Sequence, residues 1–353
     1  MGIFSVISLL GGLSIFLYGM DIMGDGLKSS SSKALKSVLE KVTHSAVLGM
    51  LTGTLVTSVI QSSTATIVLT VGLLSAGILN LRQSISIVMG ANIGTTVTAQ
   101  IIRLMDINSS GAAFIEIFKP STLAPLAVLC GIIFLKFVKS QKTKGIGMML
   151  MGFGILFTGL MGMTEAVSPL SESQAFTDVL QKFSDVPILG ILTGLITTFI
   201  VQSSSAVIGM VQALSSTGAF TFQTVYPLII GINLGTCITT AIVCSIGTDK
   251  DAKRTGIAHI LFNCIGTVLF MAAIPLLHHA GALNFIWGKP MNSGGIANFT
   301  TIFNLVTAVA LLPFTNQLVK LTTLIVKDSP DDTEDFYPEM RTLDEKLFIS
   351  PAL

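Results

Sequence analysis

The chain has 353 residues, of which 51% are hydrophobic and 11% are charged, with a formal net charge of +1. Soluble domains carry about 25% charged residues, so this composition excludes a soluble fold. The small net charge argues against a nucleic-acid partner and against peripheral attachment through a basic surface.

Long stretches of the chain contain no Asp, Glu, Lys or Arg. A membrane-spanning helix needs about 20 mostly apolar residues. The uncharged stretches are 1–20, 42–81, 83–102, 145–164, 186–248 and 290–319. We therefore expect an all-α, multi-pass membrane protein whose first span covers residues 2–20.

Two parts of the chain resemble each other at an offset of 141 residues. Residues 49–100 and 190–241 share 18 identities over 52 aligned positions, and many of these are polar. The paired motifs are Gln61-Ser-Ser-Thr-Ala65 with Gln202-Ser-Ser-Ser-Ala206, and Gly90-Ala-Asn-Ile-Gly-Thr95 with Gly231-Ile-Asn-Leu-Gly-Thr236. The pattern predicts two homologous transmembrane repeats, 1–140 and 141–326, followed by an acidic cytoplasmic tail, 327–353.

The distribution of charged residues predicts the orientation of the spans. Short cytoplasmic loops carry an excess of Lys and Arg, whereas the acidic segment 165–185 reads as external. The lysines fall into two groups that predict cytoplasmic loops, Lys28, Lys33, Lys36 and Lys41 in one and Lys136, Lys139, Lys142 and Lys144 in the other.

Each repeat contains an apolar run that is interrupted by its Gln-Ser-Ser cluster. Such a run suits two short helices that meet at a tip, a re-entrant hairpin, over 42–81 and again over 187–217. Three spans in the first repeat then invert the second repeat relative to the first, which is an architecture of secondary transporters. If each hairpin were instead two full spans, the number of crossings in the first repeat would still be odd, so the charged residues do not distinguish these two models. The expected spans are 2–20, 83–102, 120–135, 145–164, 223–246, 256–277 and 299–319.

The interrupted helices suit the binding of a small anion. A half-helix that starts inside the membrane presents free N–H groups and the positive end of its dipole. Hydroxyl and amide side chains add neutral donors, so two tips brought together would surround a small oxyanion. The expected anion ligands are Gln61, Ser62, Ser63, Thr64, Gln202, Ser203, Ser204 and Ser205.

The same breaks free carbonyl oxygens, which together with hydroxyl and amide oxygens suit a small hard cation. Neither run contains a carboxylate, and sodium therefore fits better than a divalent metal. The expected sodium ligands are Gln61, Thr57, Asn92, Thr95, Gln202, Thr198, Asn233 and Thr236. We expect no other metal and no cofactor.

A structural interpretation competes with this functional one. An isolated Ser or Thr in a membrane helix usually packs or bonds to its own backbone. Here the Gln-Ser-Ser cluster occurs at equivalent positions of the two repeats, and each Gln is followed 31 residues later by Asn-x-Gly-Thr. The repetition favours a binding site.

The paired Gln-Ser-Ser motifs, with Gly90-Ala-Asn-Ile-Gly-Thr-Thr96 and Gly231-Ile-Asn-Leu-Gly-Thr-Cys237, resemble the type II sodium/phosphate cotransporter family. Ala258-His-Ile-Leu-Phe-Asn263 and Ile302-Phe-Asn304 are similar to later motifs of that family. The resemblance covers residues 5–326, and it implies that the Gln-Ser-Ser segments form the phosphate site and parts of the sodium sites. Thr300 stands where relatives often have His, and we assign it no function.

The resemblance also concerns the end of the chain. Residues 342–353 resemble the linker that leads into a cytoplasmic PhoU-like helical domain in many bacterial members. Because the chain stops within this segment, we expect either a short member or a truncated chain.

The resemblance implies a sodium-coupled phosphate symporter that works by alternating access in the bacterial inner membrane. The expected partners are phosphate, sodium and the lipid bilayer, with a homodimer also allowed. A transporter of another small oxyanion and a passive anion channel remain alternatives. An intramembrane enzyme is disfavoured, because no span pairs a nucleophile with a titratable base.

Overall fold

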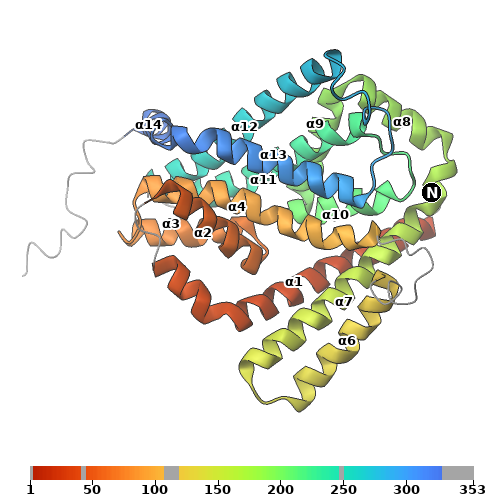
Figure 1. The fold of residues 1–353 in the computed structure, drawn as a ribbon, viewed down its shortest axis with the longest axis horizontal. Coiled ribbons are helices and arrows are strands. Elements are labelled where there is room, and N and C mark those ends of the chain that lie inside the picture. Colours follow the sequence, from red (N-terminus) through yellow and green to blue (C-terminus); the bar gives the residue numbers. More distant parts are fainter. Residues whose placement is uncertain (1–2, 41–44, 107–118, 246–249, 328–353) are drawn as a thin grey trace, which may run out of the picture.

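The computed structural model describes residues 3–40, 45–106, 119–245 and 250–327, and nearly all of them are helical (Figure 1). Seven helical segments in this part of the chain are long and apolar enough to cross a membrane. The count rises to eight if the bent pair α8 (Gln174–Asp185) and α9 (Pro187–Val201) forms one span. The chain is therefore a multi-pass membrane protein.

Each of the seven expected spans overlaps one of these seven segments. Four lie within a single α-helix, and two continue from an α-helix into a short turn. The seventh continues from α13 through η3 (Leu312–Phe314) into α14 (Thr315–Ile325). The long helices are α1 (Ile3–Glu40), α4 (Leu81–Ile102), α6 (Pro120–Phe137), α7 (Gln141–Val167), α11 (Phe222–Ser245), α12 (Lys250–His279) and α13 (Ser293–Leu311). Two short turns, η1 (Arg103–Asp106) and η2 (Ser168–Glu172), extend α4 and α7.

Each interrupted run forms two short helices. The first run gives α2 (Ala46–Ile60) and α3 (Ser63–Ser75), and the second gives α9 and α10 (Ser204–Ser215). A helix of 15 residues, such as α2, is about 22 Å long at 1.5 Å per residue, which is less than the roughly 30 Å of the hydrocarbon core. None of these four helices is long enough to cross a membrane alone.

Glycine residues allow the first helix of each run to pack closely on a long helix. In the first repeat, a side-chain carbon added at Gly90 of α4 would overlap the carbonyl oxygen of Met50 in α2. In the second repeat, the same addition at Gly231 of α11 would overlap the carbonyl oxygen of Ile191 in α9. These backbone contacts explain the paired glycine motifs of the two repeats.

Helices α1, α7 and α6 form a separate group that projects from one side of the molecule in Figure 1. Glycine contacts again join α1 to α7, as where Gly19 faces the backbone of Leu156. This group meets the hairpin helices where Phe16 of α1 covers Gly209 of α10.

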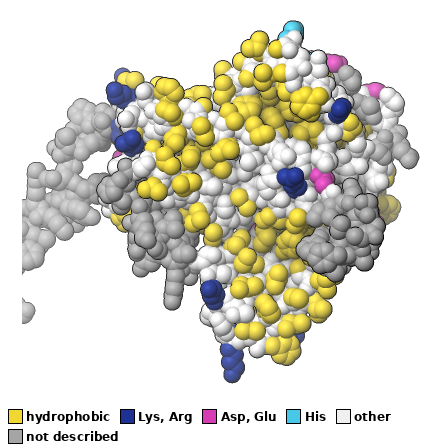
Figure 2. All heavy atoms as spheres, in the orientation of Figure 1, with side chains coloured by type: hydrophobic (Ala, Val, Ile, Leu, Met, Phe, Trp, Pro, Cys, Tyr) yellow, Lys and Arg dark blue, Asp and Glu magenta, His cyan; other side chains and the backbone are white. Residues whose placement is uncertain are grey.

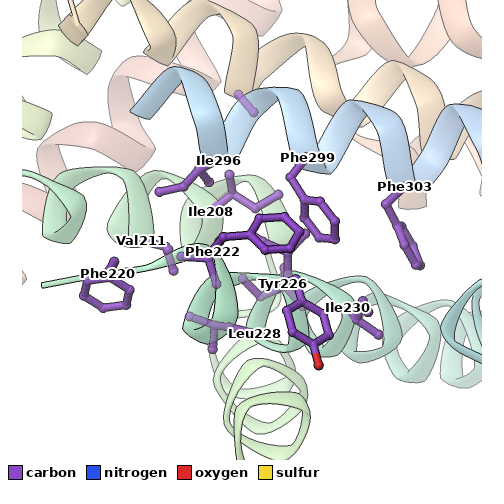
Figure 3. Packing of buried hydrophobic residues seen from close by; sticks show 14 of the residues in the cluster. Ile208, Val211, Phe220, Phe222, Tyr226, Leu228, Ile230, Ile296, Phe299 and Phe303 are labelled. Atoms are coloured by element: carbon purple, nitrogen blue, oxygen red, sulfur yellow. The ribbon is translucent and has the colours of Figure 1, made fainter. Parts of the chain in front are cut away.

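A hydrophobic core holds the second hairpin against α11 and α13 (Figure 3). Phe222 of α11 stands edge-on to Phe299 of α13, with ring centroids 5.6 Å apart, and stacks on Tyr226 at 5.7 Å. Ile208 and Val211 of α10 belong to the same core. The helix that follows Gln202 is therefore held in place by a well-packed hydrophobic core.

Part of one expected loop is helical. We expected Lys28, Lys33 and Lys36 in a cytoplasmic loop, but α1 continues through them to Glu40. Its second half contains no Gly or Pro after Gly26, and Lys and Leu are good helix formers. Lys41 and most of the expected tail, 328–353, lie outside the described residues.

Substitution of Gly90 by Ala tests the close contact of α2 with α4. The added methyl group would meet backbone, which cannot rotate away, so we expect Gly90→Ala to lower the free energy of unfolding by roughly 2 kcal/mol or more. Gly72 of α3 is the matched control, because a methyl group there meets nothing within 4 Å. Thermal unfolding in detergent measures both variants, and equal midpoints for Gly90→Ala and Gly72→Ala would contradict the packing described here.

Candidate functional site

The first Gln-Ser-Ser segment joins α2 to α3 through one left-handed residue. Gln61 has φ 60° and ψ 22°, and its backbone N–H donates to the carbonyl of Thr57 (2.7 Å) at the end of α2. Ser62 is extended, and its hydroxyl accepts the amide of Ala65 (3.2 Å) as the N-cap of α3. One helix therefore ends and another begins within two residues.

The second Gln-Ser-Ser segment repeats this backbone geometry. Gln202 has φ 60° and ψ 16°, and its backbone N–H donates to the carbonyl of Thr198 (2.8 Å). The hydroxyl of Ser203 accepts the amide of Ala206 (3.3 Å) as the N-cap of α10. The two tips thus share both sequence and conformation.

The left-handed conformation of both glutamines is an unusual feature of this chain. Gln61 and Gln202 are the two non-glycine residues with positive φ in the part of the chain that the structure describes. For an L-residue this conformation costs roughly 1–2 kcal/mol. Strained backbone of this kind is concentrated at functional sites, so its presence at both tips supports a functional role.

The first turns of α3 and α10 carry hydroxyl groups that are available to a ligand. Ser63, Ser204 and Ser205 are largely buried, and neither they nor Thr64 have a side-chain hydrogen-bond partner among the described residues. The first-turn amides also have no helical carbonyl to bind. The N-cap serine binds the amide of Ala65 or Ala206, and the other first-turn amides and the hydroxyl groups remain as donors. This is the arrangement that binds anions at helix N-termini.

The side chains of the two glutamines have different surroundings. Gln61 Nε2 donates to the carbonyl of Ser58 (2.6 Å), and Gln61 Oε1 accepts the hydroxyl of Thr98 from α4 (2.6 Å). Gln202 Nε2 donates to the carbonyl of Phe199. Gln202 is exposed, whereas Gln61 is half-buried. The first tip is thus fixed to α4, and the second tip is more open.

The threonines expected to bind sodium also differ between the repeats. Thr57 donates to the hydroxyl of Thr66 (2.9 Å), but its counterpart Thr198 is buried and has no partner for its hydroxyl. The reason is that Val207 replaces Thr66 in the second repeat. Thr95 and Thr236 each donate to the carbonyl four residues earlier, at 3.1 and 3.2 Å.

The two expected asparagines are held by polar residues of α12 and α13. Asn92 Oδ1 lies 3.1 Å from His259 Nε2 and accepts Asn263 Nδ2 at 3.4 Å. Asn233 Oδ1 accepts Asn304 Nδ2 at 3.3 Å. All five side chains are buried, and the amide oxygens of Asn263 and Asn304 have no partner. Asn92 of the first repeat therefore pairs with Asn263 of the second, whereas Asn233 and Asn304 pair within the second repeat.

A cavity of about 260 Å³ separates the first tip from α1. Gly24 of α1 lies close to the tip, since a carbon added there would lie 3.4 Å from the carbonyl oxygen of Ile60 and 3.5 Å from Gln61 Cβ. Charged residues of α1 line the same cavity, including Lys28, which is paired with Asp25 at 3.1 Å. The lining residues are Met20, Asp21, Gly24, Asp25, Lys28, Ile60, Gln61 and Ser62.

The expected residues thus form several local groups. Within the described residues, no hydrogen bond joins the first tip to the second, and none joins Asn92 or Asn233 to a glutamine. The union of the two tips in one binding site stays a prediction.

Comparison with known proteins places the chain in a family. The family model described as Na+/Pi-cotransporter matches residues 15–165 and matches again over residues 162–311. The chain belongs to the Na+/Pi-cotransporter family. The two consecutive matches meet at residues 162–165, near the end of α7.

Related proteins carry both descriptive and uninformative names. Uncharacterized protein YqeW of Bacillus subtilis is 29% identical over 88% of this chain and 95% of its own length. Putative inorganic phosphate export protein YjbB of Escherichia coli K12 is 24% identical over 99% of this chain, which spans 60% of that relative. Human sodium-dependent phosphate transport protein 2B is 34% identical over 30% of this chain and 16% of its own length. No solved structure matches.

Several residues in this member of the family were missed by sequence reasoning. His259, Asn263 and Asn304 lie in segments that resembled family motifs, and a buried Asn amide needs a partner, so a signal for them existed. Thr98 aligns with an identical residue, Thr239, in the second repeat, and this repetition was a weaker indication that Thr98 has a role. The cavity-lining carboxylates of α1 had no signal, because that helix is distant from the first tip in sequence.

Replacement of Thr98 by Val tests how the first tip is fixed. The change leaves Gln61 Oε1 without its donor, so we expect Thr98→Val to lower the free energy of unfolding by about 1 kcal/mol. Thr239→Val makes the same change at the equivalent position of the second repeat, where Gln202 receives no such bond, and it should have little effect. Thermal unfolding of the two purified variants measures the difference, and an equal loss in both would contradict the specific role of Thr98.

Proposed function

We propose that this protein is a secondary transporter that couples the movement of inorganic phosphate to sodium by alternating access. The observation that carries the proposal is the pair of Gln-Ser-Ser tips with matching left-handed backbone and unused first-turn donors. The family and the names of the relatives support phosphate as the anion. The phosphate ligands are Gln61, Ser62, Ser63, Thr64, Gln202, Ser203, Ser204 and Ser205.

Neutral donors suit a transported anion. Backbone amides and hydroxyl groups bind phosphate without a fixed positive charge, so the anion can leave again when the site opens. A site of this kind discriminates weakly between oxyanions on charge alone. Its shape, built from both tips, must therefore provide the preference for phosphate over another small oxyanion.

Sodium would complete the site by offsetting the charge of the anion. The proposed ligands include Thr198, whose buried hydroxyl has no partner, and the residues expected from the sequence, Gln61, Thr57, Asn92, Thr95, Gln202, Asn233 and Thr236. The carboxylates of Asp21 and Asp25 share a cavity with Gln61, and because Lys28 pairs with Asp25, Asp21 supplies the net negative charge next to the first tip. Hard oxygen ligands and nearby carboxylates favour sodium over an anion in that cavity.

Alternating access requires two arrangements of the tips relative to a support. The asymmetry between the repeats supports this mechanism, because Gln61 is fixed to α4 and faces α1 whereas Gln202 is exposed. The glycine contacts within each helix pair favour movement of rigid groups, with α1, α6 and α7 as one group and the hairpin helices as the other. We place the protein in the bacterial inner membrane, where a homodimer is compatible with the fold.

Export of phosphate is a second candidate function. It is favoured by the resemblance, over nearly the whole of this chain, to a protein named as a putative phosphate exporter. Coupling to sodium and the direction of net transport are separate questions, since a reversible carrier follows its gradients.

Flux measurements in proteoliposomes test the coupling. We expect an inward sodium gradient to drive labelled phosphate several-fold above its equilibrium level, and an outward gradient to drive loss of preloaded phosphate. Potassium in place of sodium is the control. Equal, purely equilibrating flux in both salts would identify a passive channel. Accumulation of sulfate but not phosphate would identify a transporter of another oxyanion.

A further inference from the structure

Two adjoining cavities lie where α4 ends and α13 begins. The first, of about 450 Å³, is lined mainly by polar residues and contains Arg103. The second, of about 350 Å³, is mainly apolar. They share three lining residues, Asn292, Gly295 and Asn298, and so lie next to each other. The molecule therefore presents one site with a polar part and an apolar part.

Arg103 gives the polar part its capacity to bind an anion. Its Nη1 donates to Asn298 Oδ1 (3.1 Å), which also lies 3.5 Å from Gln100 Nε2. The remaining N–H groups of the guanidinium have no partner among the described residues. A guanidinium held by one bond, with its other donors unused, suits a phosphate group.

Asp106 lines the same cavity but is already engaged. Its Oδ1 accepts the amide of Ser293 (3.2 Å), and its Oδ2 accepts the amide of Gly294, both in the first turn of α13. A carboxylate at a helix N-terminus is stabilised by the positive end of the helix dipole. Asp106 keeps its negative charge, and the two cavities together gain a net positive charge from Arg103 and Lys289.

The apolar part leads away from Arg103 along α13. Phe222, Phe299 and Ile302 line it, and the exposed Lys289 lies at its edge. Beyond the cavity, an exposed apolar face continues along the helix at the spacing of one turn, through Ile302, Val306 and Val309. Figure 2 shows hydrophobic side chains gathered around scattered charged ones on this side of the molecule. The face is long enough to lie against an acyl chain.

An aromatic residue places this end of the molecule at the membrane surface. Trp287 is the single Trp of the chain, and it stacks on His278 with ring centroids 3.8 Å apart. Trp residues are enriched at the level of the lipid headgroups. Trp287 also packs on Phe222, which lines the apolar cavity, so both cavities lie close to that level.

We propose that this composite site binds one anionic phospholipid. Arg103 binds the headgroup phosphate, with Lys289 adding charge at the edge, and an acyl chain follows Phe299 and Ile302 along α13. The lipid then joins the end of α4 to the start of α13. Free inorganic phosphate has the same phosphate chemistry but no group to fill the apolar cavity. The proposal does not depend on the transported substrate.

Lipid-dependent thermal unfolding of the delipidated, purified protein tests the site. We expect phosphatidylglycerol to raise the unfolding midpoint, and phosphatidylcholine or millimolar inorganic phosphate to leave it nearly unchanged. Arg103→Gln should raise the phosphatidylglycerol concentration for half the effect about fivefold, since one basic side chain near a lipid surface contributes about 1 kcal/mol. Arg82→Gln, at the opposite end of α4 and exposed, is the matched control and should have no effect.

Three results would overturn the proposal. They are an equal effect of phosphatidylcholine, displacement of phosphatidylglycerol by inorganic phosphate, and equal lipid responses of Arg103→Gln and Arg82→Gln. If Arg103→Gln does not fold, the Lys289→Gln variant tests the proposal instead, because the exposed side chain of Lys289 does not support the fold. We expect it to weaken the phosphatidylglycerol response at least twofold, and an unchanged response would contradict the site.

Discussion

Two interrupted helices impose the constraint on which the rest of this protein depends. Inside a membrane no bulk water replaces a missing backbone hydrogen bond, and an unsatisfied polar group there costs several kcal/mol. The breaks at Gln61 and Gln202 leave the first-turn amides of α3 and α10 without helical acceptors. Such breaks persist only where protein surrounds them or where a cavity admits water or a ligand.

The packing around the breaks follows from this constraint. Gly90 and Gly231 let α2 and α9 lie directly against α4 and α11, so that the helix before each break is held by backbone contacts. The buried contacts of Asn92 with Asn263 and of Asn233 with Asn304 then connect α4 and α11 to α12 and α13. Each tip is packed against neighbouring helices, and hydroxyl groups in the first turns of α3 and α10 stay without a partner, which suits a reversible anion site.

The sequence was informative where the signal was local or repeated. The helix breaks and the seven spans followed from charge-free runs and from an alignment of the chain with itself. Contacts between segments that are distant in the sequence could not be predicted, because no local pattern links Thr98 to Gln61 or Asp21 to the first tip. The length of α1 was also underestimated, since lysines were taken as the mark of a loop although they also suit a helix. The inversion of the repeats and the meeting of the tips stay predictions.

The number of phosphate ions bound per chain tests most directly whether the two tips form one site. In saturating sodium, we predict that the purified protein binds one phosphate per chain at equilibrium. We also predict that Gln61→Ala and Gln202→Ala, each shown by thermal unfolding to be folded, lose that binding separately, because both tips contribute to the same anion. Two phosphates per chain, or normal affinity in either variant, would contradict the account.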